Sequence, residues 1–223
     1  MKSEDAPVKY SQTQLMNDFK DLSNAMIIKI VESFPVAGPA ISGFWEFIAQ
    51  RNQRRILDFS ALVMEALNSH KHFEGQITAE KIIDIFESVA LNAIKTDEQE
   101  KLLHYRNLFI NSCSNKHEIE QGEIEIFMQL IKEFTPVHIY LIKKYHEHSN
   151  FRLTNKQVED TLHNLGVSKD TLQFHCQWLE SRSLLREITG DEKKMWSIAG
   201  YDFEELIKTP YLDKFAKFIL DNG

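Results

Sequence analysis

The sequence predicts a mainly α protein, with a helical bundle over residues 1–134 and a smaller domain with a short β-hairpin over residues 135–223. Glycine and proline number only 8 and 5 and cluster at a few turns, which leaves long stretches that neither residue interrupts. Apolar residues recur through those stretches at helical spacing. One late segment differs, because two apolar runs flank a Gly-Asp turn there, as in a hairpin.

The composition is that of an ordinary globular chain with an acidic surface. Of 223 residues, 43% are hydrophobic and 26% charged, and the net charge is −7. Residues 1–134 hold 14 basic and 20 acidic side chains, whereas residues 135–223 hold 12 and 13. Such a surface disfavours non-specific binding to nucleic acid or anionic lipid.

The upstream domain begins with two predicted helices. The first runs from about Gln12 to Ser33 and ends at the segment Phe34–Pro39, where two prolines flank a glycine. The second runs from about Ala40 to Asn68 and is long, with an apolar first third and a basic middle. We expect this pair to form a helix–turn–helix corner.

Three more helices complete the predicted bundle. Thr78 is the expected N-cap of the third, and Thr96 caps the fourth in a capping box with Gln99. The fifth shows apolar residues at i, i+3, i+4 and i+7, which predicts a single buried stripe. The members of that stripe are Ile124, Phe127, Met128, Ile131 and Phe134.

The downstream domain is predicted to hold three short helices, a hairpin and a closing helix. Thr-Pro pairs at Thr135 and Thr209 are helix starts, because threonine caps the helix and proline fits its first position. A second helix follows the capping box Thr154–Gln157 and ends at Gly166. Ser168 caps a third, with Leu172, Cys176 and Leu179 buried; the expected hairpin strands are Leu184–Ile188 and Met195–Ile198.

This order of helices and hairpin, from Val167 through Leu206 in particular, resembles winged helix-turn-helix domains of bacterial regulators. The resemblance includes an aromatic segment after the second strand, Gly200–Phe203. It implies that the third helix enters a DNA major groove and that the wing contacts phosphates. The matching positions are Lys169, Thr171, Gln173 and Gln177 on the helix, and Lys193 and Lys194 in the wing.

The charge of this domain leaves the kind of partner open. Phosphate neutralisation supplies much of the affinity for DNA, so DNA-binding domains carry a basic face. Residues 135–223 are close to neutral. We therefore expect the domain either to bind DNA or to serve as a protein-docking or purely structural module, and a second copy of the chain is one such protein partner.

The upstream half is similar to a group of bacterial helical proteins of unassigned function. The similarity lies in Glu32–Gly43, in Gln50–Arg55 and in Lys81–Ala90, which precedes a Thr-capped helix. It implies a bacterial or mobile-element origin and no particular activity.

Arg51, Arg54 and Arg55 lie on one face of the second helix at i, i+3 and i+4. They could contact a phosphate, a lipid headgroup or a partner's carboxylates, or remain solvated, with Arg54 paired to Asp58. The apolar corner at residues 33–49 raises the alternative of a membrane-associated effector. Its uncharged run from Ser33 to Trp45 is too short to span a bilayer.

No catalytic, metal or cofactor motif is evident, so we expect a protein that is not an enzyme and needs no cofactor. The pairs His70–His72 and His146–His148 have i, i+2 spacing, which points their rings to different sides of a helix. His117–Gln121 resembles a zinc motif but lacks the second histidine. Cys113 and Cys176 fall on apolar stripes, which predicts buried free thiols and a cytoplasmic location.

These observations predict a non-enzymatic regulatory or adaptor protein of bacterial type. Its winged-helix-like domain would bind a macromolecule, and its helical half would dimerise or sense a partner.

Overall fold

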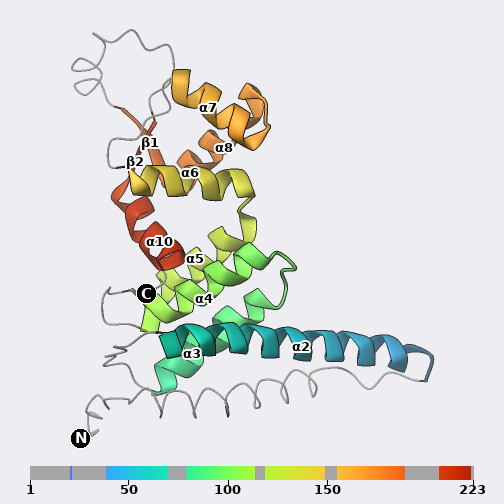
Figure 1. Ribbon diagram of the computed structural model, residues 1–223. Helices are drawn as coiled ribbons and strands as arrows, with labels where there is room; N and C mark the ends of the chain where they lie inside the picture. Colours follow the sequence, from blue (N-terminus) through green and yellow to red (C-terminus); the bar gives the residue numbers. More distant parts are fainter. Residues whose placement is uncertain are drawn as a thin grey trace, which may run out of the picture. The chain divides into compact units, whose positions relative to one another are not determined.

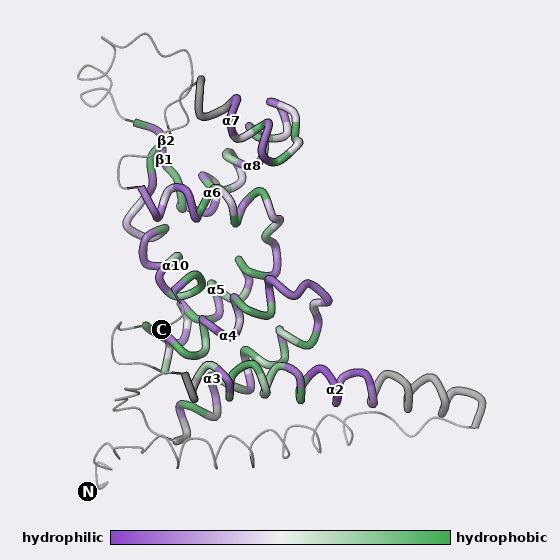
Figure 2. The backbone as a smooth tube through the Cα atoms, in the orientation of Figure 1, coloured by the Kyte–Doolittle hydropathy of each residue, from purple (hydrophilic) through white to green (hydrophobic). Residues whose placement is uncertain are grey.

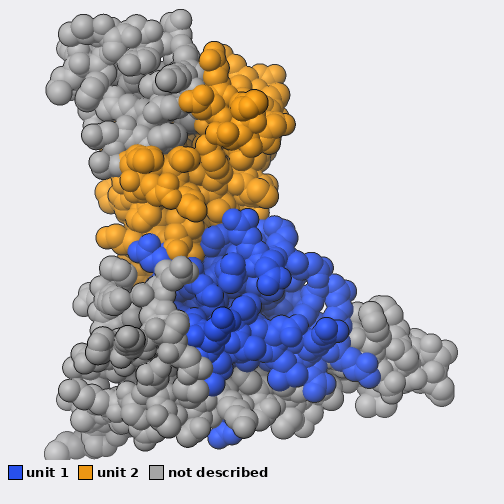
Figure 3. All heavy atoms as spheres, in the orientation of Figure 1, with its two compact units in different colours: residues 1–132, 221–223 blue, residues 133–220 orange. Residues whose placement is uncertain are grey.

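The computed structural model describes Asp21 and residues 39–69, 79–113, 119–148, 155–188 and 206–221. These residues form helices and one two-stranded antiparallel sheet, which confirms the mainly α fold class. The chain divides into two compact units: residues 1–132 with 221–223, and residues 133–220 (Figure 3). The sequence-based division at Phe134–Thr135 lies two residues from this one and differs in the last three residues.

The first unit contains the described helices α2, α3 and α4 and nearly all of α5 (Figure 1). α3 packs against α2 and α4, and α2 packs against α4. The helices predicted for these segments are confirmed, whereas the one predicted from Gln12 to Ser33 lies, Asp21 apart, outside the described residues. The bounds are Pro39–Ser69 for α2, Ala79–Ala93 for α3, Gln99–Cys113 for α4 and Gln121–Glu133 for α5.

α4 is the central helix of this unit, since every residue from His104 to Cys113 except Arg106 is buried. Phe86 on α3 stacks on Phe59 of α2 at 6.1 Å and meets Phe109 of α4 edge-on at 5.6 Å. The Tyr105 hydroxyl donates to the Met128 carbonyl of α5 at 3.3 Å. Figure 2 shows the hydrophilic stretch of α2 giving way to apolar residues where that helix meets α3 and α4.

The start of α4 differs from the prediction. Thr96 does not cap the helix, because the first helical carbonyl is that of Glu98, which accepts from Leu102 N–H at 3.2 Å. The Thr96 hydroxyl instead accepts from Glu98 N–H at 3.1 Å, closing a local turn two residues earlier. A threonine followed three residues later by glutamine therefore marks a turn here rather than a capping box.

The second unit contains four described helices and the sheet. α6 contacts α8, α10 and β2, and α8 also contacts α7 and β1. Thr135 is the N-cap of α6, as predicted, and Pro136 is its first residue. The bounds are Pro136–Glu147 for α6, Asn155–Leu165 for α7, Lys169–Ser181 for α8, Leu185–Glu187 for β1, Leu206–Lys208 for β2 and Pro210–Leu220 for α10.

The sheet pairs a predicted strand with a segment that the sequence left unassigned. Leu185 lies opposite Lys208, and Glu187 opposite Leu206, in antiparallel register. The predicted second strand, Met195–Ile198, lies outside the described residues. The buried Tyr145 hydroxyl donates to the Leu206 carbonyl at 3.2 Å and so attaches β2 to α6.

Thr209 joins the sheet to the closing helix. Its backbone N–H donates to the Leu184 carbonyl at 3.1 Å, and its hydroxyl donates to the Ser183 carbonyl at 2.7 Å. The same hydroxyl accepts from Leu212 N–H at 3.1 Å, which caps α10. The predicted inward residues of α10 are buried, namely Leu212, Phe215, Ala216 and Ile219.

α8 ends in a left-handed turn at Ser183, whose φ is 59°. Ser183 N–H donates to the Glu180 carbonyl at 2.8 Å, and Leu184 N–H donates to the Leu179 carbonyl at 3.0 Å. This is the Schellman arrangement, in which glycine is the favoured residue at the left-handed position.

Replacing Ser183 with glycine is therefore expected to raise the free energy of unfolding by about 0.5–1 kcal/mol, because glycine relieves the strain of positive φ. Urea unfolding at neutral pH measures this change in the free energy of unfolding. The matched control is Ser181→Gly in the last helical turn, which should lower stability by about 0.5 kcal/mol. Equal destabilisation by both substitutions would show that Ser183 is not strained.

Candidate macromolecule-binding face

α8 has one face fixed in the second unit. Leu172, Cys176 and Leu179 are buried, which confirms the stripe predicted from their spacing. Both cysteines, Cys113 and Cys176, are buried free thiols, as predicted. Burial raises the pKa of Cys176 to about 12 and also raises that of Cys113, so neither thiol ionises at neutral pH.

The N-terminal end of α8 is closed by its own polar side chains. Ser168, the predicted cap, accepts from Thr171 N–H at 3.2 Å, and its hydroxyl lies 2.9 Å from that of Thr171. Gly166, with φ of 63°, supplies the left-handed residue that ends α7. The Thr171 hydroxyl is thus part of the cap, although the side chain is exposed.

The exposed face of α8 carries three of the predicted contact residues in one row. Lys169, Gln173 and Gln177 are exposed and recur at every fourth position, so they lie on one side of the helix. Phe174 lies beside this row and is 62% exposed. We call these four residues the α8 ridge. Thr171 is two positions from Lys169, on another side of the helix, and Lys193 and Lys194 lie outside the described residues.

A cation at the end of α8 is balanced within the unit. Arg182 Nη2 lies 2.7 Å from Glu133 Oε2, and its guanidinium carbon lies 5.2 Å from the centre of the Trp178 ring. The exposed Asp170 stands next to Lys169 at the other end. Charges of both signs therefore flank the ridge, and its described part is not a basic strip.

Two histidines join α8 to α6 behind the ridge. His138, which is 2% exposed, stacks on Trp178 with ring centres 4.4 Å apart. Its Nε2 lies 2.9 Å from Nδ1 of His175. Phe134 meets Trp178 edge-on at 5.6 Å, which closes the cluster.

The hydrogen bonds fix the tautomers of this pair. His138 is the third residue of α6, and its Nδ1 accepts from the backbone N–H of the cap residue Thr135 at 3.2 Å. Nδ1 therefore has no hydrogen, and the hydrogen of the neutral ring is on Nε2. His138 Nε2–H then donates to His175 Nδ1. The sequence offered one signal that was missed, a histidine at the capping-box position of a Thr-Pro helix.

The same geometry argues against a metal ion on this pair. A histidine that binds metal through Nε2 donates Nδ1–H to an acceptor, but His138 Nδ1 itself accepts from Thr135 N–H. Among the described residues there is no group of three or more histidine, cysteine or acidic side chains that could hold a metal ion. Of the other histidines considered, His146 lies 3.4 Å from Asp213 Oδ1 and His148 is exposed, whereas His70, His72 and His117 lie outside the described residues.

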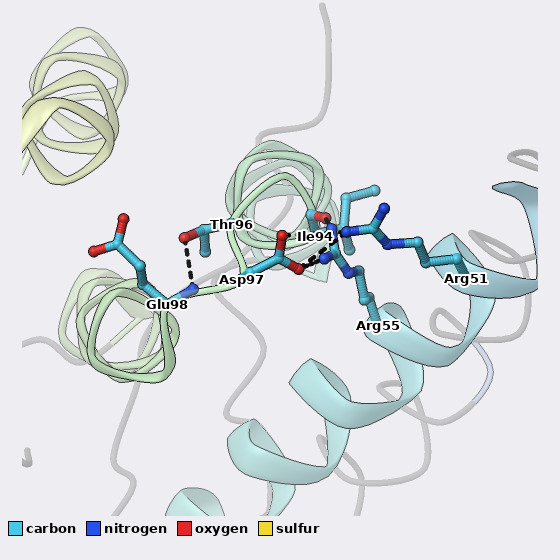
Figure 4. A network of polar contacts seen from close by, with 6 residues as sticks. All are labelled: Arg51, Arg55, Ile94, Thr96, Asp97 and Glu98. Carbon is cyan, nitrogen blue, oxygen red and sulfur yellow. Dashed lines mark hydrogen bonds and ion pairs between the residues drawn. The ribbon is translucent and has the colours of Figure 1, made fainter.

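In the first unit, Arg51 and Arg55 bind the turn between α3 and α4 (Figure 4). Arg51 Nη2 donates to both carboxylate oxygens of Asp97, at 3.1 and 3.2 Å. Arg55 also pairs with Asp97 and donates to the Ile94 carbonyl at 2.6 Å. Burial and the neighbouring Arg51 lower the pKa of Arg55. Arg54 is exposed. Two of the three predicted anion contacts thus hold a carboxylate of this chain.

Arg55→Gln is expected to lower the free energy of unfolding by about 1–2 kcal/mol, because it removes a charge-assisted bond to the Ile94 carbonyl. Chemical denaturation at pH 7.5 gives the value. Arg54→Gln on the adjacent position is the control and should stay within about 0.5 kcal/mol of the parent chain. Equal stability of the two variants would show that the contacts of Arg55 with Ile94 and Asp97 do not stabilise the fold.

The apolar corner offered as a membrane contact is described only in part. Residues 33–38 lie outside the described residues, and residues 39–49 form the first turns of α2. Among the helices described, none combines the length and the apolar character that crossing a bilayer requires.

Comparison of the chain with protein-family models, curated proteins and solved structures gives no match.

Proposed function

We propose that the chain is a non-enzymatic regulatory or adaptor protein that binds a protein partner through the α8 ridge. The observation that carries this proposal is the 62% exposure of Phe174 on a helix whose opposite face is buried. An exposed aromatic ring on a rigid element loses little conformational entropy when it binds, and aromatic residues dominate the energetics of protein interfaces.

The side chains around Phe174 support a protein interface. Gln173 and Gln177 each offer two N–H donors and a carbonyl acceptor, which suits a polar rim around an apolar anchor. A partner that covers the ridge would remove Phe174 from water while the glutamine amides exchange water for hydrogen bonds with the partner. Lys169 and Asp170 add one charge of each sign at the edge.

DNA is the second candidate, and the order of elements favours it. Three helices, α6, α7 and α8, are followed by antiparallel strands, which is the order of a winged helix, with α8 as the groove-reading helix. The charges weigh against it, because Arg182 is paired with Glu133 and Asp170 flanks Lys169. DNA affinity depends on several unpaired cations.

Photo-crosslinking tests the ridge. A photoreactive amino acid at Gln173, and separately at Gln177, is expected to give the same protein adduct in cells that make the full chain. The exposed Asp84 on α3 is the control position and should give none. A product of twice the chain mass would identify a second copy as the partner.

Phe174→Ala is expected to reduce the adduct at Gln173 at least about tenfold, since loss of a central aromatic anchor costs about 2 kcal/mol or more. Helical circular dichroism should be unchanged, because position 174 is exposed and alanine favours helix. Leu57→Ala on α2, another exposed apolar side chain, should leave the adduct intact.

Gel retardation of random-sequence duplex DNA at low salt distinguishes the second candidate. Retardation that Lys169→Gln abolishes and Phe174→Ala preserves would assign the ridge to nucleic acid and contradict the protein proposal. Binding of a protein partner that depends on Phe174 and is insensitive to salt would support the protein proposal.

A further inference from the structure

A hydrogen bond between His138 and His175 joins α6 to α8. His138 Nδ1 accepts a hydrogen bond from Thr135 N–H at 3.2 Å, and His138 Nε2–H donates a hydrogen bond to His175 Nδ1 at 2.9 Å. In this series of hydrogen bonds, His138 Nδ1 and His175 Nδ1 are acceptors and His138 Nε2 is a donor. The Thr135 backbone N–H sets this direction, because it can only donate. The chain of hydrogen bonds therefore has one arrangement that satisfies all its members.

Adding a proton breaks this arrangement at either ring. Protonated His175 carries a hydrogen on Nδ1 and cannot accept from His138. His138 could accept instead only by moving its own hydrogen to Nδ1, which faces Thr135 N–H. The Thr135 hydroxyl, 3.3 Å from Nδ1, could take that hydrogen, but Thr135 N–H would still lose its acceptor. Acid thus breaks either the hydrogen bond between the helices or the bond from Thr135 N–H to His138 Nδ1 at the start of α6.

We propose that the His138–His175 hydrogen bond is an acid-sensitive latch that fixes α8, and with it the α8 ridge, on α6. Neutral histidines close the latch and protonation of His175 opens it. This goes beyond the proposed function, because it concerns the free chain and requires no partner. It gives the ridge one orientation at neutral pH and a less constrained one in mild acid.

The burial of His175 favours its neutral form, as the latch requires. Burial lowers the pKa of His175 from its usual 6.5. The unfolded chain therefore takes up this proton before the folded chain does. The stabilising contribution is complete above about pH 6.5 and is lost as the pH falls from there to the lowered folded value.

Other titratable groups lie on the elements around the pair. His146 lies 3.4 Å from Asp213 Oδ1. Glu133 and Arg182 balance each other, and Cys176 stays protonated. The remaining groups with described side chains are Lys169, Asp170 and Glu180 on α8, Glu159, Asp160 and His163 on α7, Tyr140, Lys143, Lys144, Tyr145 and Glu147 on α6, Arg186 and Glu187 on β1, Lys208 on β2, and Tyr211, Lys214 and Lys217 on α10.

His175→Gln tests the latch, because the glutamine carbonyl can accept from His138 Nε2–H and does not titrate. Urea unfolding of the full chain is measured at pH 7.5 and 5.0. Acidification should raise the unfolding constant of the parent chain about fivefold to tenfold more than that of the variant, the range expected for one hydrogen bond. His163→Gln on α7, an exposed position, should respond as the parent does.

Nitrogen chemical shifts of the histidine rings provide a measurement that needs no variant. At pH 7.5, His138 should show a bare Nδ1 and a protonated Nε2, and His175 a bare Nδ1. In acid, the His138 and His175 resonances should change together with the indole signal of Trp178, which stacks on His138. A protonated Nδ1 on His138 at pH 7.5, or the same acid response in His175→Gln as in the parent, would overturn the proposal.

Discussion

The second unit is organised around one aromatic side chain that precedes its first helix. Phe134 is 2% exposed, and its ring contacts His138 on α6 at 5.8 Å, Trp178 on α8 at 5.6 Å and Phe215 on α10 at 5.4 Å. Aromatic contacts of this kind add to the free energy of burying the rings. Three helices far apart in sequence thus share one buried ring, and the exposed face of α8 is oriented by that packing.

The helices were predictable because their signals are local. The side chains of Thr135, Ser168 and Thr209 each cap a helix by accepting from the backbone N–H three residues later. The buried stripe of α8 follows from the spacing of its apolar residues alone. The partner of β1 was not predictable. Strands of three residues have little register of their own, and β2 is held by Tyr145, which lies 61 residues before Leu206.

The candidate site divides in the same way. Periodicity placed Lys169, Gln173 and Gln177 on one exposed side, but it could not show that the Thr171 hydroxyl lies against Ser168. Nor could it pair Arg51 and Arg55 with Asp97, because 46 and 42 residues separate them from that carboxylate. The bond between His138 and His175 spans 37 residues. Contacts set by the tertiary fold leave no periodic trace in the sequence.

Thr209 has a mechanical consequence for the second unit. One hydroxyl both caps α10 and donates to the carbonyl of Ser183, two residues beyond the end of α8. A tilt or a rotation of α8 that moved its C-terminal end would therefore also withdraw the hydroxyl from the first turn of α10. Strain applied at the exposed helix would thus have a polar route to the C-terminal helix through Thr209, in addition to the buried route through Phe134.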